Sequence, residues 1–276
     1  MSLMDRDVAE SKKDRLVQQL RGIDSLVIAF SGGVDSSLLL AVAHEALGAS
    51  AVAATATSEI YPVKEKDGAI RFGRDRGIEH IVFHSHEASL PAFISNGPER
   101  CYHCKKSLFQ QLSEIASSRG IRHVAHGANV DDLDDYRPGF RAATEMGIMA
   151  PLLDAGLNKQ DIRFLSREIG LDTWDKPAMA CLATRIPYGS PITREKLRMI
   201  EEAETFLLDR GLGQCRVRHH GSVARIEVES QHLKMVLRDD LTKAIVNKFR
   251  DIGFCHISLD LEGYVSGSMN RALNID

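Results

Sequence analysis

The chain has 276 residues, 43% of them hydrophobic and 26% charged, which is the composition of a water-soluble protein with room for one large domain or two modest ones. No apolar run approaches the roughly 18 residues that a membrane span needs, and the polar N-terminus lacks an apolar signal core, so we expect a cytoplasmic protein with no membrane partner. The net charge of −3 gives no electrostatic reason to expect a nucleic-acid partner.

The first half of the chain alternates between strand-like and helix-like segments. The expected strands are short apolar runs at 25–30, 51–57, 80–85 and 122–128. The expected helices are a leading amphipathic segment at 8–21 and further segments at 36–47, 63–76 and 105–119. Strands that alternate with helices through short connections predict an α/β fold, a parallel sheet with helices on both faces. In such sheets, ligands bind beyond the carboxyl ends of the strands.

The pattern changes after about residue 188. The expected elements are a helix at 193–210, an alternating strand pair at 215–229, a helix at 231–250 and a strand at 254–264. These elements predict a smaller α+β domain. The prolines and the glycine of RIPYGSPIT (185–193) are typical of a linker. We therefore expect two domains, at 1–186 and 187–276.

The segment AFSGGVDSSLLL (29–40) lies between an expected strand and an expected helix. The backbone N–H groups of such a glycine turn, together with the N-terminus of the helix, form an anion site, and phosphate is its natural ligand. The segment matches neither the GxxxxGK[ST] loop nor the GxGxxG dinucleotide pattern. The alternative is a tight turn in which Ser31 or Asp35 merely caps the helix.

SGGVDSS resembles the pyrophosphate loop (PP-loop) of the N-type ATP pyrophosphatases, a superfamily that includes GMP synthetase and tRNA-thiolating enzymes. The residues that match the motif are Ser31, Gly32, Gly33, Asp35 and Ser36. The resemblance implies an enzyme that cuts ATP between its α and β phosphates and adenylates an oxygen of its substrate. The loop would hold the departing diphosphate while Mg²⁺ neutralises charge, with Asp35 as a catalytic, metal-side carboxylate.

Four further stretches together resemble the LarE family over nearly the whole chain. They are GANVDDLDDYRPG (127–139), PLLDAGLNKQDIRFLSREIGL (151–171), DKPAMACLATRIPYG (175–189) and RVRHHGSVARIE (216–227). The resemblance implies a sulfur transferase that converts the carboxylates of pyridinium biscarboxylic acid mononucleotide into thiocarboxylates, on the way to the nickel-pincer nucleotide of lactate racemase. It also implies a homo-oligomer, with a hexamer as one candidate.

The LarE resemblance assigns roles to six side chains. They are Arg216 and Arg218 at phosphate, Arg185 and Lys105 near the substrate, and Glu204 and Glu227 at a divalent cation. Alternation supports part of this assignment, because Arg216 and Arg218 are two apart on an expected strand and so point to one face, where both can bind one phosphate. The alternative is a solvated strand face. Met235 stands where the family has another carboxylate.

The placement of the cysteines bears on how sulfur reaches the substrate. Some LarE proteins give up the sulfur of one cysteine, and that position aligns with Ala180, next to Cys181. RCYHCKK places Cys101 and Cys104 just before an expected helix, whose dipole favours thiolates. If these two and Cys181 converge, three thiolates can hold a [4Fe–4S] cluster and leave one iron open for a sulfide that attacks the acyl-adenylate. The resemblance implies such a three-cysteine class.

Several alternatives stay open at this point. Zn²⁺ could replace the cluster, with His103 as a fourth ligand, or Cys181 could be sacrificed in a single turnover. Cys215 and Cys255 lie in strand-like runs and are expected in the core. Histidines without ligand spacing are expected to be structural or surface residues: His80, His84, His86 and His126. Two other functions compete, a PP-loop tRNA thiolase and a non-catalytic nucleotide-binding or metal-binding protein.

Overall fold

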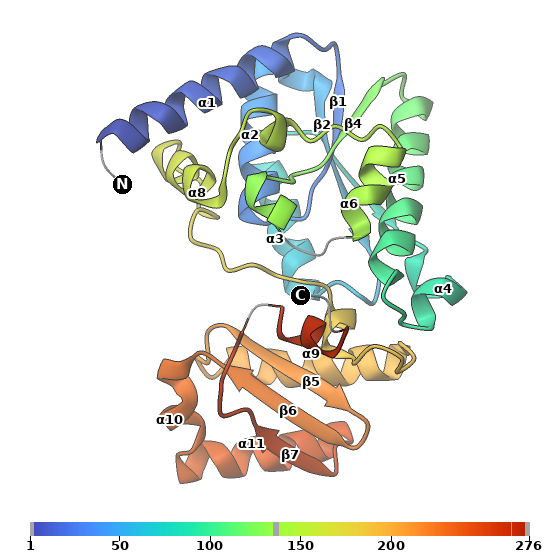
Figure 1. The fold of residues 1–276 in the computed structure, drawn as a ribbon, viewed down its shortest axis with the longest axis vertical. Helices are drawn as coiled ribbons and strands as arrows, with labels where there is room; N and C mark the ends of the chain where they lie inside the picture. Colours follow the sequence, from blue (N-terminus) through green and yellow to red (C-terminus); the bar gives the residue numbers. More distant parts are fainter. Residues whose placement is uncertain (1–2, 135–137, 266, 274–276) are drawn as a thin grey trace. The chain divides into compact units, whose positions relative to one another are not determined.

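The computed structural model describes residues 3–134, 138–265 and 267–273 (Figure 1). The chain folds into two compact units, each formed by two segments. Unit 1 comprises Met1–Leu90 and Cys101–Met179, and unit 2 comprises Pro91–Arg100 and Ala180–Asp276. The last boundary between the two units thus lies after Met179. The sequence predicted a domain boundary after residue 186.

Unit 1 contains a sheet of four parallel strands in the order β3-β2-β1-β4. The strands are β1 (Leu26–Ala29), β2 (Ala51–Thr57), β3 (His80–His84) and β4 (His123–Ala125). Val27 of β1 is in register with Val52 on one side and with Val124 on the other. The four strands lie within the four segments that the sequence predicted, and the predicted parallel sheet is confirmed.

Helices cover both faces of this sheet (Figure 1). They are α1 (Leu3–Arg21), α2 (Val34–Leu47), α3 (Val63–Asp75), α5 (Arg100–Ser118), α6 (Pro138–Glu145), α7 (Pro151–Asp154) and α8 (Lys159–Glu168). Leu26 and Ile28 of β1 pack in one buried cluster with α1, α2, α3, α7 and α8. Val27, which alternation turns to the other face, packs in a second cluster with α5 and α6. The α/β class predicted from the sequence is therefore confirmed.

The strand order places a switch point beside β1. The chain leaves β1 through α2 and returns to β2, while β4 pairs with the opposite edge of β1. β1 and β4 are neighbouring strands, and the loops that follow them leave the carboxyl ends of these two strands in different directions. Open α/β sheets bind ligands in the crevice between two such loops. The SGGVDSS loop follows β1, and the GANVDD stretch follows β4.

Unit 2 contains a second, smaller sheet of three strands in the order β5-β6-β7. The strands are β5 (Cys215–His220), β6 (Val223–Val228) and β7 (His256–Leu259), and the helices are α4 (Pro91–Ile94), α9 (Arg194–Leu208), α10 (Leu233–Val236) and α11 (Asp239–Ile252). Val217 and Ile226 pack with α9 and α11 in the core of the unit. The predicted helix at 231–250 is two helices, because Arg238 between them has an extended backbone (φ −68°, ψ 136°).

The segment Pro91–Arg100 belongs to unit 2 through buried hydrogen bonds. The Asn96 side-chain amide donates to three carbonyl oxygens of the predicted linker (185–193) at 2.8–3.2 Å. The guanidinium of Arg100 donates to Asn96 and, at 3.2 Å, to the carbonyl oxygen of Ala183. The predicted linker is thus fixed within unit 2 by residues about ninety positions earlier in the chain. None of the helices in the described ranges has the length and apolar character that a membrane span requires.

Candidate functional site

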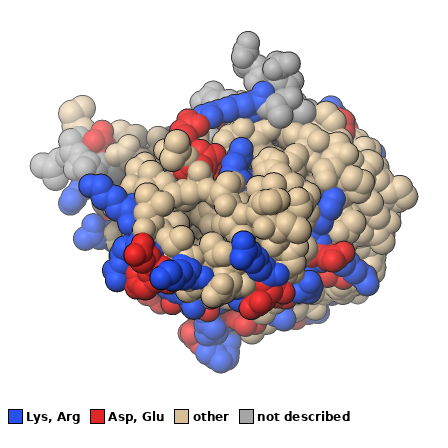
Figure 2. All heavy atoms as spheres, turned by 90° about the horizontal axis from the view of Figure 1, so that it is seen from below, with Lys and Arg blue, Asp and Glu red and all other residues tan. Residues whose placement is uncertain are grey.

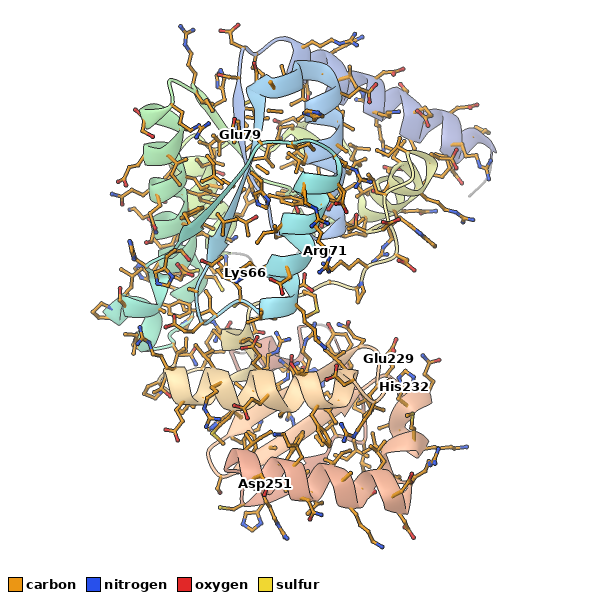
Figure 3. The ribbon with its side chains drawn as sticks, turned by 180° about the vertical axis from the view of Figure 1, so that it is seen from behind. Lys66, Arg71, Glu79, Glu229, His232 and Asp251 are labelled. Atoms are coloured by element: carbon orange, nitrogen blue, oxygen red, sulfur yellow. The ribbon has the colours of Figure 1, made fainter. Side chains whose placement is uncertain are left out.

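The SGGVDSS loop makes a tight turn from β1 into α2, and glycine is required at its second position. Gly32 has a φ of +70°, in the left-handed region that other residues seldom adopt. A Cβ atom at Gly32 would lie 3.2 Å from the Cβ of Ala69 in α3. Figure 3 shows α3 from behind, with Lys66 and Arg71 labelled. Both the turn and the close approach of α3 therefore depend on the absence of a side chain.

Hydroxyl groups stabilise the loop from within. The Ser36 Oγ donates to the carbonyl oxygen of Gly33 at 3.2 Å and lies 3.1 Å from the Ser31 Oγ. Gly33 is the N-cap of α2, and α2 has no side-chain cap hydrogen bond in the described part of the chain. Neither Ser31 nor Asp35 is the cap, so the capping alternative does not hold. The first N–H groups of α2 and the positive end of its dipole together form an anion site.

Asp35 lies in the first turn of α2, where its carboxylate binds a lysine. The Lys159 Nζ donates to both oxygens, at 2.5 and 2.6 Å, and the Asn129 Nδ2 donates to one of them at 3.2 Å. The side chains of Lys159 and Asp35 are 35% and 25% exposed. A partly exposed carboxylate with an ammonium partner can exchange that partner for another cation. The Mg²⁺ role of Asp35 stays a prediction.

A second glycine brings the loop after β4 to the first turn of α2. A Cβ atom at Gly127 would lie 3.0 Å from the backbone N of Ser36 and 3.2 Å from the carbonyl carbon of Asp35. The absence of a side chain at this position allows the two loops to pack backbone against backbone. Asn129, two residues further on, can then reach Asp35. The loops that follow β1 and β4 thus pack against each other at the switch point.

Lys176, which lies near the last residue of unit 1 in the sequence, binds the SGGVDSS loop. Its Nζ donates to the carbonyl oxygen of Gly32 at 2.9 Å and forms an ion pair with Glu65 of α3 at 2.7 Å. The Arg163 guanidinium holds the backbone around Lys176 by donating to the carbonyl oxygens of Trp174 and Lys176 at 2.9 and 3.0 Å. Two lysines, Lys159 and Lys176, therefore lie at the loop.

Sequence reasoning did not single out Asn129, Lys159 or Lys176. All three lie in stretches that carried the family resemblance, at 127–139, 151–171 and 175–189. That resemblance gave these stretches no individual roles. A charged side chain in a loop has no periodicity that reveals its partner, and Lys176 lies 144 residues from Gly32.

Lys105 lies at the same end of the unit 1 sheet. Burial, together with the positive charge of Lys105, lowers the pKa of His126 to about 4. His126 directly follows β4, and its ring lies 5.5 and 6.1 Å from the rings of Phe109 and Phe140. The Lys105 Nζ is 5.8 Å from the centre of the Phe109 ring. Lys105 is thus placed near the end of β4, and its contact with substrate stays a prediction.

Cys101 and Cys104 lie within the first turns of α5, which begins at Arg100 and not near residue 105 as expected. Residues three apart on a helix share a face, so these two side chains point the same way. Cys101 is half-buried and Cys104 is 8% exposed. Cys181, also half-buried, belongs to unit 2. Within residues 3–134, 138–265 and 267–273, no three His, Cys, Asp or Glu side chains form a group that could hold a metal ion.

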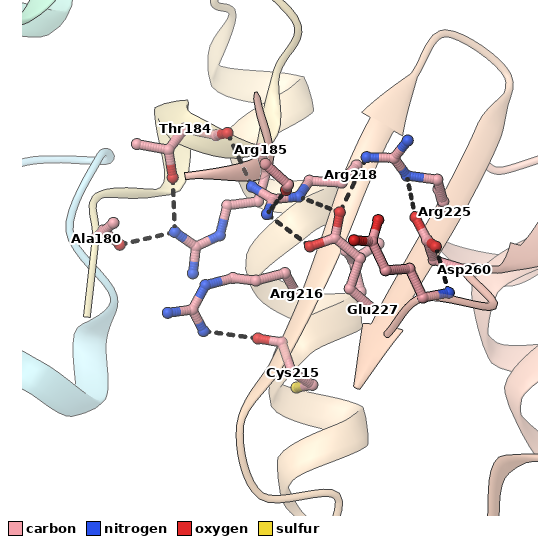
Figure 4. Close-up of polar contacts among 12 residues, drawn as sticks. Ala180, Thr184, Arg185, Cys215, Arg216, Arg218, Arg225, Glu227 and Asp260 are labelled. Atoms are coloured by element: carbon pink, nitrogen blue, oxygen red, sulfur yellow. Dashed lines mark hydrogen bonds and ion pairs between the residues drawn. The ribbon is translucent and has the colours of Figure 1, made fainter. Parts of the chain in front are cut away.

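Arg185 is fully buried in unit 2 and forms a bidentate ion pair with Glu204 of α9. The Nε and Nη2 atoms of Arg185 donate to the two carboxylate oxygens, each at 2.9 Å. Burial disfavours the charged guanidinium, but Glu204 more than offsets this effect, and the pKa of Arg185 is raised. Arg185 also donates to the carbonyl oxygens of Ala180 and Cys181 at 2.8 and 3.0 Å. In this arrangement it positions the segment that carries Cys181 (Figure 4).

Arg216 and Arg218 share one face of β5, at 4% and 5% exposure, so this strand face is not solvated. Arg218 donates to both oxygens of Glu227, at 2.9 and 2.6 Å, and Arg225 donates to the same carboxylate at 2.9 Å (Figure 4). Arg216 donates to the carbonyl oxygen of its neighbour Cys215 at 2.7 Å. We call Arg185, Arg216, Arg218 and Arg225 the arginine cluster. Their phosphate role stays a prediction.

Glu204 and Glu227 were predicted to bind a divalent cation. Both oxygens of each carboxylate accept hydrogen bonds from guanidinium groups of the arginine cluster. The negative charge of each carboxylate is thus already balanced by a guanidinium group. The metal role of these two glutamates therefore stays a prediction, and the structure gives them a different role, the neutralisation of buried arginines.

The two remaining cysteines differ. Cys215 is 2% exposed, and burial raises the pKa of its thiol to about 12, which agrees with the predicted core position. Cys255 is exposed, so its predicted core position is wrong. The neighbouring Phe254, at 2% exposure, takes the buried position, and successive residues of an extended chain point to opposite sides.

The parallel sheet, its covering helices and the SGGVDSS loop at the switch point define the fold of the PP-loop ATP pyrophosphatases. No protein-family model matches the chain. It is 34% identical over 266 residues to pyridinium-3,5-bisthiocarboxylic acid mononucleotide synthase of Lactiplantibacillus plantarum, with 95% of each chain covered. It is 41% identical over 264 residues to an uncharacterized protein of Synechocystis sp., with 96% of this chain and 98% of the relative covered.

A more distant relative is a GMP synthase subunit of Pyrococcus furiosus, which is 24% identical over 217 residues that cover 71% of this chain and 66% of the relative. The full-length identity to the Lactiplantibacillus synthase decides the assignment, and the chain belongs to the LarE family. This membership implies ATP, with Mg²⁺, as the ligand of the PP-loop.

Proposed function

We propose that the protein is an ATP-dependent sulfur transferase that replaces carboxylate oxygen by sulfur in pyridinium biscarboxylic acid mononucleotide, a step of nickel-pincer nucleotide synthesis. The single observation that carries the proposal is the identity to a synthase of that name over 95% of both chains. The loop geometry supports the use of ATP, because Gly32 and the uncapped N-terminus of α2 form an anion site. We also expect a homo-oligomer, a hexamer being one candidate.

The first step is adenylation. A carboxylate oxygen of the substrate attacks the α-phosphorus of ATP, the bond from that phosphorus to the bridging oxygen breaks, and diphosphate leaves with the electron pair. The N–H groups of the loop and of α2 stabilise the diphosphate as its charge develops. Mg²⁺, held on the Asp35 side, would neutralise part of that charge.

The second step replaces oxygen by sulfur. Sulfide attacks the acyl carbon, the bond from that carbon to the AMP oxygen breaks, and AMP leaves. No atom changes its oxidation state, and inorganic sulfide is a sufficient sulfur source. Arg216 and Arg218 would hold the substrate phosphate, and Lys105 would bind near the reacting carboxylate. Arg185 would position the Cys181 segment through the carbonyl oxygens that it binds.

We propose that Cys101, Cys104 and Cys181 hold the sulfur-delivering centre. Thiolates are the ligands that iron–sulfur clusters require, and Cys101 and Cys104 share one face of α5. When bound, a [4Fe–4S] cluster with three cysteine ligands supplies an iron with an open position for sulfide. Cys101 also directly follows Arg100 in the chain, and the guanidinium of Arg100 binds the carbonyl oxygen of Ala183, two residues after Cys181.

Two other centres would use the same cysteines differently. Zn²⁺, with His103 as its fourth ligand, would stabilise the site but supply no sulfur. Sacrifice of Cys181 alone would give a single turnover. Anaerobic purification followed by iron and zinc analysis and visible absorption separates these cases. We expect iron and a brown protein, and single changes of Cys101, Cys104 or Cys181 to Ala should each abolish multiple turnover. If only Cys181→Ala is inactive, the sacrificial route holds.

Two other functions remain to be tested against the proposal. A PP-loop tRNA thiolase would need RNA for ATP cleavage. The net charge of −3 disfavours it, and basic and acidic side chains are interspersed on the face that Figure 2 shows. A non-catalytic nucleotide-binding protein would bind ATP without releasing AMP and diphosphate.

The decisive experiment is anaerobic incubation of the protein with MgATP, sulfide and the pyridinium dicarboxylate nucleotide. The product is followed by mass, together with AMP and diphosphate release. We expect a gain of about 16 mass units for each oxygen replaced, with one AMP per sulfur. An otherwise identical reaction without sulfide should adenylate the substrate but yield no thiocarboxylate. The absence of substrate-dependent AMP release would overturn the proposal.

A further inference from the structure

Lys176 lies against the turning residue of the PP-loop. Its ammonium is 2.9 Å from the carbonyl oxygen of Gly32 and 2.7 Å from a carboxylate oxygen of Glu65. Because Gly32 is where the loop turns, Lys176 contacts the backbone of the loop that we propose binds diphosphate. Glu65 lies in the first turn of α3, the helix whose Ala69 packs against the same glycine.

This ion pair is open to exchange. The side chains of Lys176 and Glu65 are 24% and 20% exposed, which places the pair at the surface of the site and not in the core. Solvent access weakens an ion pair, because water competes for both charges. A diphosphate offers several negative oxygens, and charge-assisted hydrogen bonds to phosphate are about twice as strong as neutral ones. The ammonium therefore gains by leaving the carboxylate for a phosphate.

The backbone at Lys176 is fixed, so the side chain alone has to move. Arg163 donates to the carbonyl oxygens of Trp174 and Lys176 at 2.9 and 3.0 Å. A lysine on a fixed backbone can turn its flexible four-carbon stem between two nearby acceptors at small cost. The side chain of Lys176 thus places an ammonium group at the loop.

We propose that Lys176 is a diphosphate-binding residue of the PP-loop, and that Glu65 is the carboxylate that competes with the diphosphate for its ammonium. On binding, the ammonium exchanges the Glu65 carboxylate for an oxygen of the diphosphate and keeps its position beside Gly32. Glu65 then competes with the diphosphate for one cation. The inference rests on the proposed use of ATP at this loop. It adds Lys176 as a residue that would contact the diphosphate that leaves ATP.

The test is calorimetric titration of the full-length protein with inorganic pyrophosphate and Mg²⁺, with no substrate and no sulfur source. Lys176→Met should weaken pyrophosphate binding about 10- to 100-fold, the effect of losing one hydrogen bond to a charged group. It should leave AMP binding unchanged, because AMP lacks the β phosphate. Lys176→Arg should recover part of the affinity. Glu65→Gln should tighten pyrophosphate binding, because the competing carboxylate is gone.

Two control variants match these changes on α3. Asp67→Asn removes an exposed carboxylate two residues from Glu65, and Arg74→Met removes a cation that pairs with Asp75 at the other end of the helix. Neither should change pyrophosphate affinity. Weakened binding in Glu65→Gln would overturn the proposal, because the pair would then serve only to hold the loop. Wild-type affinity in Lys176→Met would also overturn it.

The outcome separates this inference from the proposed function. Pyrophosphate binding needs neither the pyridinium nucleotide nor a sulfur source. If the variants behave as expected while the wild-type protein forms no thiocarboxylate, the role of Lys176 stands and the proposed function fails. If the wild-type protein forms thiocarboxylate and Lys176→Met binds pyrophosphate normally, only the inference fails. Glu65→Gln gives a second test should Lys176→Met not fold.

Discussion

Glu204→Gln tests whether this buried glutamate neutralises Arg185 or binds a metal ion. Glu204 accepts two bonds from Arg185 and one from the backbone N of Val217, all at 2.9 Å. Glutamine keeps the shape and can still accept from Val217, but it loses the charge opposite a guanidinium that has no solvent access. Breaking a buried ion pair costs about 3–5 kcal/mol, and we expect a loss of about 3 kcal/mol in the free energy of unfolding.

The assay is urea unfolding followed by circular dichroism, with Glu202→Gln as the matched control. Glu202 lies two residues earlier on α9 and pairs with Arg198 at 2.6 Å, with both side chains well exposed. Such a surface pair on a helix contributes about 0.3–0.5 kcal/mol, so the control should lose little stability. Equal stability of the two variants, with Mg²⁺-dependent ATP cleavage lost only in Glu204→Gln, would refute the ion-pair reasoning and favour the metal role.

Three further changes test the loop and its surroundings. Gly32→Ala should abolish ATP binding, measured by calorimetry, and cost about 1–2 kcal/mol of unfolding free energy, because alanine is strained at a φ of +70°. Lys159→Met should lower the Mg²⁺ concentration for half-maximal binding, because the ammonium no longer competes for Asp35. Lys105→Met should raise the pKa of His126, followed by NMR, because Lys105 disfavours the imidazolium.

The pKa of His126 also sets a pH dependence of stability. It is lowered to about 4 in the folded protein, against about 6.5 for a histidine in the unfolded chain. The unfolded chain therefore binds more protons between these values, and stability falls as the pH drops from about 6.5 through 4. His126→Phe, which keeps an aromatic ring next to Phe109 and Phe140, should reduce this loss. If the free energy of unfolding of His126→Phe falls with decreasing pH as steeply as that of the wild-type protein, His126 is not the cause of the acid destabilisation.

The fold of unit 1 was predictable because its signals are local. Short apolar runs such as 25–30 and 51–57 are typical of buried strands, and both contain strands of the parallel sheet. The SGGVDSS loop was predictable for the same reason, since its conformation depends on a few neighbouring residues. Alternation placed Arg216 and Arg218 on one strand face correctly.

What could not be predicted depends on contacts between distant residues. No sequence pattern around Asn96 indicates its hydrogen bonds to carbonyl oxygens about ninety residues later in the chain. The sequence analysis therefore did not predict that residues 91–100 belong to unit 2. Glu65 lies 111 positions before Lys176, and charge pairs at such a separation leave no periodic signal. The partners of Glu204 and Glu227 were missed because the family resemblance gives a residue a role but not a neighbour.

Hydrogen bonds hold the chain on each side of the boundary between the two units, just before Cys181 and at Cys181 itself. Lys176 is held to the PP-loop in unit 1, and the carbonyl oxygens of Ala180 and Cys181 are held by Arg185 in unit 2. Cys181 is five residues from Lys176, so a fully extended chain keeps their Cα atoms within about 18 Å. The chain length therefore sets an upper limit on the distance between the proposed sulfur ligand and the residue proposed to bind the departing diphosphate. The two proposed steps act on one substrate carboxylate, so they require the two sites to come together, because the acyl-adenylate proposed for the first step would be the electrophile of the second.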